Sequence, residues 1–174
     1  MKGMKNFFRE SLSTVLTAVI LSLILRAYVV EARVIPSGSM LPTIQLHDRV
    51  LVNKFIYNFT EPQRGDIIVF EPPESLGVKH DFIKRVIGLP GDVIEIRDGK
   101  VYVNGEPLKE PYIFEAPRYN FGPVKVPEDS LFVLGDNRNE SFDSHVWRAW
   151  LKIEDVKGKA FYRYWPPQRI GLLH

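Results

Sequence analysis

Two residues of this chain carry side chains that can together hydrolyse an amide bond. Ser39 lies in the stretch Ile35–Thr43, which reads IPSGSMLPT, and Lys84 lies in the stretch Phe82–Asp92, which reads FIKRVIGLPGD. A serine hydroxyl attacks a carbonyl carbon only when a base removes its proton, and a neutral lysine can be that base. Because the reference pKa of lysine is about 10.4, the site must lower it by burial or by a neighbouring positive charge. The apolar residues on both sides of Lys84 favour such burial.

Each of these residues also has an ordinary structural explanation. A serine in a Ser-Gly-Ser turn is commonly a loop residue, and a lysine between apolar residues is commonly a charge on an edge strand. If residues 81–87 form a strand, Lys84 and Arg85 point to opposite faces. We then expect one of them to enter the core and the other to reach solvent.

A third motif gathers polar side chains directly after an apolar run. Residues 135–144 read GDNRNESFDS. As an ordinary structural feature this is a solvated turn, in which Asp136 and Arg138 form an ion pair. Asp143 and His145 also leave open a Ser–His–Asp triad. We rank the triad second, because residues two apart on an extended segment face the same side without necessarily pointing at each other.

The three motifs, together with a hydrophobic segment before them, resemble a bacterial type I signal peptidase. That family is made of membrane-bound serine proteases that remove leader peptides from exported proteins. The motifs occur in the family's order, and the resemblance covers nearly the whole chain. It implies that Ser39 is the nucleophile and that Lys84 is the general base.

The resemblance also implies supporting roles. The Ser37 hydroxyl would supply a donor for the oxyanion, beside the backbone N–H of the nucleophile. Ser141 would hydrogen-bond the lysine, and Asp143 would support the surrounding polar network. The chain departs from the family at His145, where many members have arginine, and at Arg148, where many have glycine. A neutral histidine would bond to Asp143 without contributing a charge.

The implied substrate is a preprotein that carries a signal peptide and binds in extended form. An extended peptide can add a strand to a sheet edge. Cleavage is expected just after the small residues that end the signal peptide, so the pockets should be shallow and apolar. The same apolar residues can equally be core. The candidates are Ile35, Pro36, Met40, Ile44, Phe82 and Ile83.

Residues 12–30 read LSTVLTAVILSLILRAYVV, and they predict a transmembrane anchor. As a helix they would extend roughly 28 Å, nearly the thickness of the hydrocarbon core of a bilayer. Arg26 lies near the outer end, from where its long side chain can reach the headgroups. A cleavable signal peptide is the alternative, although the apolar run exceeds the usual length of its hydrophobic region.

The basic residues on either side of this segment predict its orientation. Lys2, Lys5 and Arg9 precede it, whereas only Arg33 follows closely. Basic residues favour the cytoplasmic side, so we expect a single-pass protein of the bacterial cytoplasmic membrane with its N-terminus inside. The expected parts are a cytoplasmic start at 1–11, the anchor at 12–30 and an extracytoplasmic catalytic domain at 31–174.

The remaining pattern predicts a mainly β, partly barrel-like domain of short antiparallel strands. The dipeptide Asp98-Gly99 predicts a tight hairpin, and Asn104-Gly105 predicts a second turn. The stretch Pro107–Pro127 is irregular and is expected to form an extended excursion, whose aromatic residues pack locally or contact lipid. The predicted strands are 49–54, 66–70, 81–87, 93–97, 101–103, 130–134 and 160–165.

Composition excludes several other classes of protein. The net charge of +2 comes from 23 basic and 21 acidic residues spread along the chain, so no basic tract predicts nucleic acid as a partner. There is no cysteine, and His47, His80 and His174 lack the spacing of metal ligands, so we expect neither metal nor cofactor. The expected partners are therefore preproteins and the lipid bilayer.

Two alternative functions remain open. A self-cleaving Ser–Lys protease of the repressor type would share the dyad, but it would normally be soluble and carry a DNA-binding region. A catalytically silent β-domain tethered to a membrane would only bind partners. Cleavage of a leader-bearing precursor in trans is expected from the signal peptidase alone.

Overall fold

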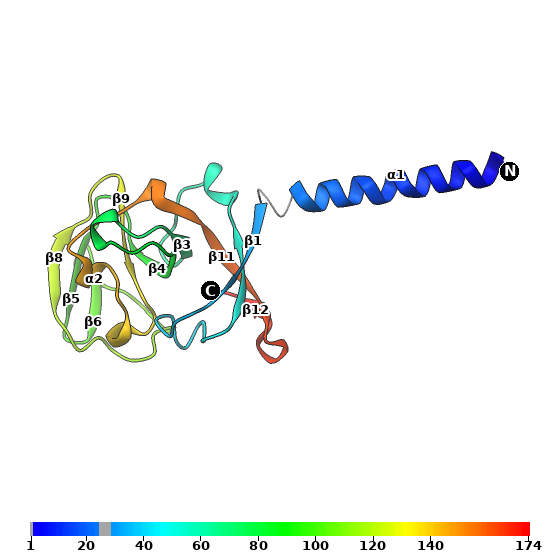
Figure 1. Cartoon of the computed structure of the whole chain (residues 1–174). Helices are drawn as coiled ribbons and strands as arrows, with labels where there is room; N and C mark the ends of the chain where they lie inside the picture. The colour runs from blue at the N-terminus through cyan, green and yellow to red at the C-terminus, as the bar shows by residue number, and fades with distance from the viewer. Residues whose placement is uncertain (1, 25–28) are drawn as a thin grey trace.

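The computed structural model describes residues 2–24 and 29–174. One long helix leads into a body of short strands (Figure 1). The helices are α1 (Lys2–Ile24) and the short α2 (Ser144–Trp147). The strands are β1 (Val30–Val34), β2 (Arg49–Asn53), β3 (Ile67–Phe70), β4 (Phe82–Gly88), β5 (Val93–Arg97), β6 (Lys100–Val103), β7 (Glu106–Pro107), β8 (Phe121–Lys125), β9 (Ser130–Leu134), β10 (Leu151–Lys152), β11 (Val156–Trp165) and β12 (Gly171–Leu172).

The strands form two antiparallel sheets. The larger has the order β1-β2-β11-β3-β4-β9-β10, with β12 paired to β11, and the smaller has the order β7-β6-β5-β8. In Figure 1 the small sheet lies at the left of the body, and β1 and β12 lie at the right, where α1 leads away. The larger sheet curls, with register shifts in the pairings of β11 with β2 and with β3 and in the pairing of β4 with β9. The prediction of a mainly β, partly barrel-like domain is confirmed.

The seven predicted strands correspond to β2, β3, β4, β5, β6, β9 and β11. The predicted hairpin is also present: Asp98 and Gly99 have φ angles of 51° and 71°, and they join β5 to β6. Two positive φ angles in succession are the geometry that favours Asp-Gly in such a turn. The sequence analysis missed β1, whose EAR centre lacks apolar alternation, and β8, which contains Gly122 and Pro123.

Three aromatic residues of the excursion at 107–127 pack locally, as one of the two alternatives expected. The guanidinium carbon of Arg85 lies 3.9 Å from the ring centre of Tyr112. Tyr119 stacks on a histidine, and Phe121 packs on Phe132 of β9. Phe114 stays 60% exposed. The excursion therefore covers one side of the strands that carry the polar motifs.

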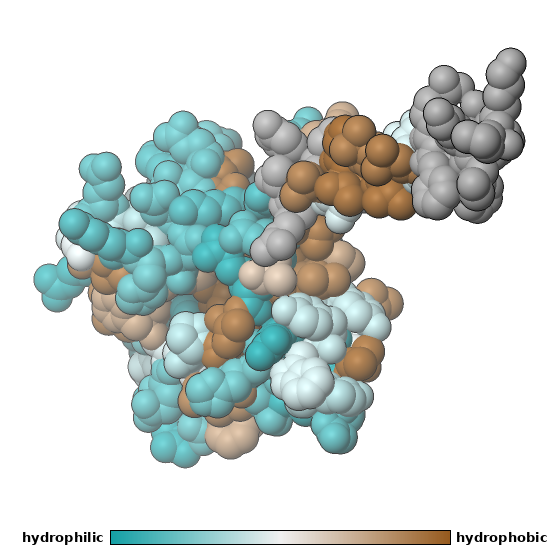
Figure 2. Space-filling model, turned by 45° about the vertical axis from the view of Figure 1, so that its right-hand side comes forward, coloured by the Kyte–Doolittle hydropathy of each residue, from teal (hydrophilic) through white to brown (hydrophobic). Residues whose placement is uncertain are grey.

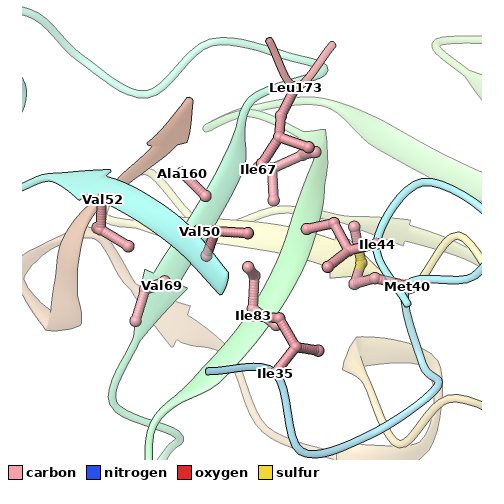
Figure 3. Packing of buried hydrophobic residues seen from close by; sticks show 10 residues of the cluster. All are labelled: Ile35, Met40, Ile44, Val50, Val52, Ile67, Val69, Ile83, Ala160 and Leu173. Atoms are coloured by element: carbon pink, nitrogen blue, oxygen red, sulfur yellow. The ribbon is translucent and has the colours of Figure 1, made fainter. Parts of the chain in front are cut away.

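Apolar side chains from β2, β11, β3 and β4 of the larger sheet meet in one buried cluster. Figure 3 shows Ile83 of β4 and Ile35 pointing into the same interior as Val50 and Val69. Burial of these side chains removes apolar surface from water and holds β2, β3 and β4 together. The cluster consists of Ile35, Met40, Ile44, Val50, Val52, Ile67, Val69, Ile83, Ala160 and Leu173.

The predicted anchor overlaps α1 but has different limits. The helix begins at Lys2, and Val30 already belongs to β1, where it pairs with Asn53. Residues 25–28, with Arg26 among them, lie outside the described residues. No helix within residues 2–24 and 29–174 is both long and apolar enough to cross a bilayer. The described side chains of α1 are exposed and largely apolar, as the brown part of the helix in Figure 2 shows. The anchor stays a prediction.

A buried ion pair joins β4 to the turn after β9. Arg85 donates from Nε to Asp136 Oδ1 at 2.8 Å and from one terminal nitrogen to Oδ2 at 2.7 Å. The two residues are 1% and 0% exposed. Arg85 was expected to reach solvent and Asp136 to pair with Arg138, and both expectations are wrong. The excursion covers that face of β4, and Arg138 pairs instead with Glu110 at 2.5 Å.

Replacing Asp136 by asparagine should destabilise the fold strongly. The variant leaves the guanidinium of Arg85 buried without its compensating charge, which typically costs about 3–5 kcal/mol of unfolding free energy. Denaturant unfolding followed by circular dichroism measures the loss. Asp129→Asn, which removes an exposed pair with Lys152, is the matched control and should change little. Equal, small losses for the two variants would contradict a structural role for the buried pair.

Candidate active site

The structure brings Ser39 and Lys84 into contact across 45 positions of sequence. Lys84 Nζ donates to Ser39 Oγ at 2.7 Å. Lys84 lies in the middle of β4 and is 4% exposed, while Ser39 lies in the turn after β1 and is 8% exposed. This is the geometry that a lysine base and a serine nucleophile require.

Contacts on two sides hold the turn that carries Ser39. On one side the next residue, Met40, is fully buried in the cluster of Figure 3. On the other side Asn137 donates from its backbone N–H to the Ser39 carbonyl at 3.1 Å and from its side chain to the Gly38 carbonyl at 3.2 Å. Sequence reasoning did not single out Asn137, although it lies within the third motif.

Burial lowers the pKa of Lys84 from 10.5 to about 8. Nearby Asp143 and Asp136 act in the opposite direction, because a negative charge favours the protonated amine. Burial dominates, since β4 is covered on both faces from Ile83 onward. A substantial fraction of Lys84 is therefore neutral slightly above neutral pH and able to accept a proton.

Ser37 lies at the mouth of the site. Its side chain is exposed, and its Oγ is 3.4 Å from Ser39 Oγ. The hydroxyl can rotate toward a carbonyl oxygen placed next to the nucleophile. The position suits the predicted oxyanion donor.

Ser141 packs against the site without making the predicted hydrogen bond to Lys84. Its Oγ is buried and has no hydrogen-bond partner within the part of the chain described. Lys84 Nζ donates instead to Ser39 and to the Ile83 carbonyl. A Cβ on Gly135 would overlap the Ser39 carbonyl and lie 2.6 Å from the Ser141 Cβ, so this close approach requires glycine.

Asp143 is fully buried and links Gly135 to His145. Its Oδ2 accepts the backbone N–H of Gly135 at 2.9 Å, and its Oδ1 lies 2.6 Å from His145 Nδ1. Asp143 and His145 thus point at each other, contrary to our reason for discounting a triad. The imidazole, however, stacks on Tyr119 and does not line the cleft that contains Ser39. The described contacts of Ser39 Oγ are with Lys84 and Ser37, so they assemble a Ser–Lys pair and no Ser–His–Asp triad.

The dyad opens into a cleft of about 580 Å³, and a second hollow of about 400 Å³ adjoins it. Of the six candidate pocket residues, Pro36, Phe82 and Ile83 line both spaces, and Ile35 lines the second. Met40 and Ile44 are instead core residues. The sequence analysis did not propose four residues that also line the cleft: His80, Asp81, Glu140 and Phe142.

No three histidine, aspartate or glutamate side chains of the described residues form a set that could hold a metal ion. Metal independence remains a prediction. The polar groups nearest the dyad are engaged otherwise: Asp143 with Gly135 and His145, and Asp136 with Arg85.

Comparison with known proteins agrees with this geometry. The family model described as signal peptidase, peptidase S26, matches residues 8–165. A probable signal peptidase I-2 of Synechocystis sp. is 51% identical over 172 residues, which cover 97% of this chain and 78% of that protein. A signal peptidase I of Leptolyngbya laminosa is 49% identical and covers 94% of this chain and 83% of its own.

Among solved structures, the crystal structure of a signal peptidase I from Enterococcus faecalis V583 is similar to this one. The match has a TM-score of 0.50 and 36% sequence identity, and it covers 57% of this chain and 97% of that chain.

The pH dependence of amide cleavage should report the lowered pKa of Lys84. A lysine with a pKa of about 8 passes from about one tenth neutral at pH 7 to about nine tenths neutral at pH 9. We therefore expect kcat/KM for an uncharged peptide amide to rise about tenfold over that interval. A profile measured from pH 6 to 10.5 checks this. A midpoint near 10.5, the ordinary value for lysine, would show that the amine is not desolvated in the working enzyme.

Proposed function

This chain belongs to the signal peptidase I family of serine peptidases, which remove signal peptides, and we propose that Ser39 is its nucleophile and Lys84 its general base. The 2.7 Å contact between a buried lysine amine and a serine hydroxyl at a cleft carries the proposal. The pKa of Lys84, lowered to about 8 by burial, supports it.

In the proposed reaction the neutral amine of Lys84 takes the proton of Ser39 as Oγ attacks the scissile carbonyl carbon. The oxyanion that forms accepts hydrogen bonds from the Ser39 backbone N–H and the Ser37 hydroxyl. The ammonium of Lys84 then gives its proton to the departing amine, which leaves the signal peptide esterified to Ser39. A water molecule, deprotonated by the same amine, hydrolyses the ester and regenerates Ser39.

Two further residues support the dyad in this proposal. Asp143 holds the backbone N–H of Gly135, and Gly135 packs directly on the Ser39 carbonyl. The Ser141 hydroxyl has no partner among the residues described, so it is available to orient Lys84 when Ser39 turns toward the substrate. Both residues would hold the Lys84 amine and the Ser39 hydroxyl in position for proton transfer.

The substrate is proposed to lie extended between the segment before Ser39 and the start of β4. Pro36 forms one wall of the cleft, and Phe82 and Ile83 form the other. These apolar walls approach the dyad closely, which favours small side chains before the scissile bond. The two alternatives, a self-cleaving repressor-type protease and a silent binding domain, do not explain an open cleft at an intact dyad in a signal peptidase family member.

We also propose that residues 12–30 anchor the protein in a membrane. The N-terminus at 1–11 would then lie in the cytoplasm and residues 31–174 outside it. The proposal is supported by the exposed apolar side chains of α1, which include Leu12, Val15 and Leu16, and by the basic residues that precede them in sequence. The preprotein would be held in the same bilayer.

Ser39→Ala and Lys84→Ala should each lower the rate of precursor cleavage by at least about a thousandfold while the fold is kept, because each removes half of the dyad. Lys84→Arg should fail as well, since a guanidinium stays protonated. Lys100→Ala, at an exposed lysine of β6, is the matched control and should cleave normally. The assay is processing of a leader-bearing precursor, with the N-terminus of the product sequenced. Normal cleavage by any of the dyad variants would remove that residue from the mechanism.

A chain shortened to begin at Val29 should keep its active site and lose its attachment to the membrane. Because the enzyme and precursor no longer share a bilayer, their effective concentration falls. We expect unchanged cleavage of a short soluble peptide and a loss on the order of tenfold or more for a precursor in vesicles.

Both substrates are measured with the full chain and the shortened chain, and a shortened Ser39→Ala variant serves as the blank. Equal losses on peptide and precursor would show that the N-terminal segment shapes the catalytic site itself.

A further inference from the structure

His145 is held on two sides at the edge of the active site. Its Nδ1 lies 2.6 Å from Asp143 Oδ1, and its ring stacks on Tyr119 with the ring centres 3.9 Å apart and the planes 6° apart. The backbone N–H of His145 also donates to Asp143 Oδ1 at 3.3 Å. These contacts fix the plane of the imidazole ring and the direction in which Nδ1 points.

Asp143 connects His145 to the backbone next to the nucleophile. Its other oxygen accepts the N–H of Gly135, and Gly135 packs on the Ser39 carbonyl so closely that it has no room for a Cβ. A rotation of the Asp143 carboxylate would release Gly135. The peptide that lies behind Ser39 would then be free to move.

Asp143 also acts on the base through its charge. It is the strongest of the neighbouring charges that raise the pKa of Lys84, ahead of Asp136. Asp136 is already compensated by Arg85 in a buried pair. His145 is the side chain that the described structure places in contact with Asp143 Oδ1.

The other charged groups near His145 are fixed. Tyr119 faces Asp143, Arg138 and Glu110, and burial raises the pKa of its hydroxyl, so it stays neutral through the working range. Arg138 and Glu110 form their own pair at 2.5 Å. A substitution of His145 therefore changes the charge beside Asp143 without breaking the Arg138–Glu110 pair.

We propose that His145 is a positioning residue of the dyad, which holds Asp143 against Gly135, and that the charge present at position 145 sets how strongly Asp143 acts on Lys84. The inference rests on the proposed function, since it takes Lys84 as the general base.

The sign of the effect follows from the charges. An imidazolium offsets the negative charge of Asp143, so Lys84 loses its proton more easily. A neutral imidazole leaves that negative charge unopposed, so Lys84 keeps its proton to higher pH.

Two substitutions separate the charge of residue 145 from its hydrogen bond. H145R keeps a permanent positive charge beside Asp143. H145N keeps a neutral amide N–H at the position of Nδ1. We expect the midpoint of the kcat/KM profile for a soluble peptide to move to lower pH in H145R and to higher pH in H145N, by about half a unit or more each.

H145Q is the second neutral variant, used if H145N does not fold, and thermal unfolding checks every protein. H47R adds the same charge at an exposed histidine outside the cleft and should leave the midpoint where it is.

Coincident midpoints for H145R and the neutral variant would overturn the proposal, whether or not the plateau rates fall. K84A in the same titration keeps the two claims apart. If K84A is inactive throughout while the midpoints coincide, the role of His145 fails and the dyad stands. If K84A retains the pH profile of the unsubstituted protein, the assignment of Lys84 as the general base is wrong.

Discussion

The site depends on keeping a lysine amine out of water. A lysine at a surface would be charged at neutral pH and useless as a base, so Lys84 must be desolvated while its Nζ still reaches Ser39 Oγ. A strand that is covered on both faces provides this environment. The rest of the domain can be understood as the means of covering β4 on both sides while leaving one end of the dyad open to a cleft.

The two coverings differ in chemistry. On the Lys84 side, β4 meets the turn that carries Ser39. On the other side the buried guanidinium of Arg85 is compensated by the carboxylate of Asp136 and covered by the ring of Tyr112. A buried pair of this kind contributes less to net stability than it costs to break. Its position ties β4, which carries the base, to the third motif, which carries Ser141 and Asp143.

The parts that were predictable from sequence are those with a local cause. Short apolar runs, alternating or continuous, located seven strands, and Asp98-Gly99 located a hairpin because only a few residue types tolerate two positive φ angles. The dyad was found through its motifs, and the structure places Ser39 and Lys84 in contact.

The parts that escaped prediction depend on contacts distant in sequence. The strand β1 exists because β2 pairs with it, and nothing in Glu31, Ala32 or Arg33 alone announces a strand. Asp136 and Arg138 do not pair with each other, because the excursion at 107–127 brings Glu110 to Arg138. Asp136 pairs with Arg85 instead. The contact of His145 with Asp143 is a local exception: it requires a short helical turn at α2, with Asp143 as its cap, where an extended segment was assumed.

The central claim is that the amine of Lys84 is neutral over much of the working pH range. Nuclear magnetic resonance of protein with ¹³C,¹⁵N-labelled lysine, in which the Lys84 signal is assigned by its loss in Lys84→Arg, measures this ionisation without substrate. The account predicts that the Lys84 side-chain shifts titrate at about pH 8. Titration near 10.5, together with the other lysines, would contradict it.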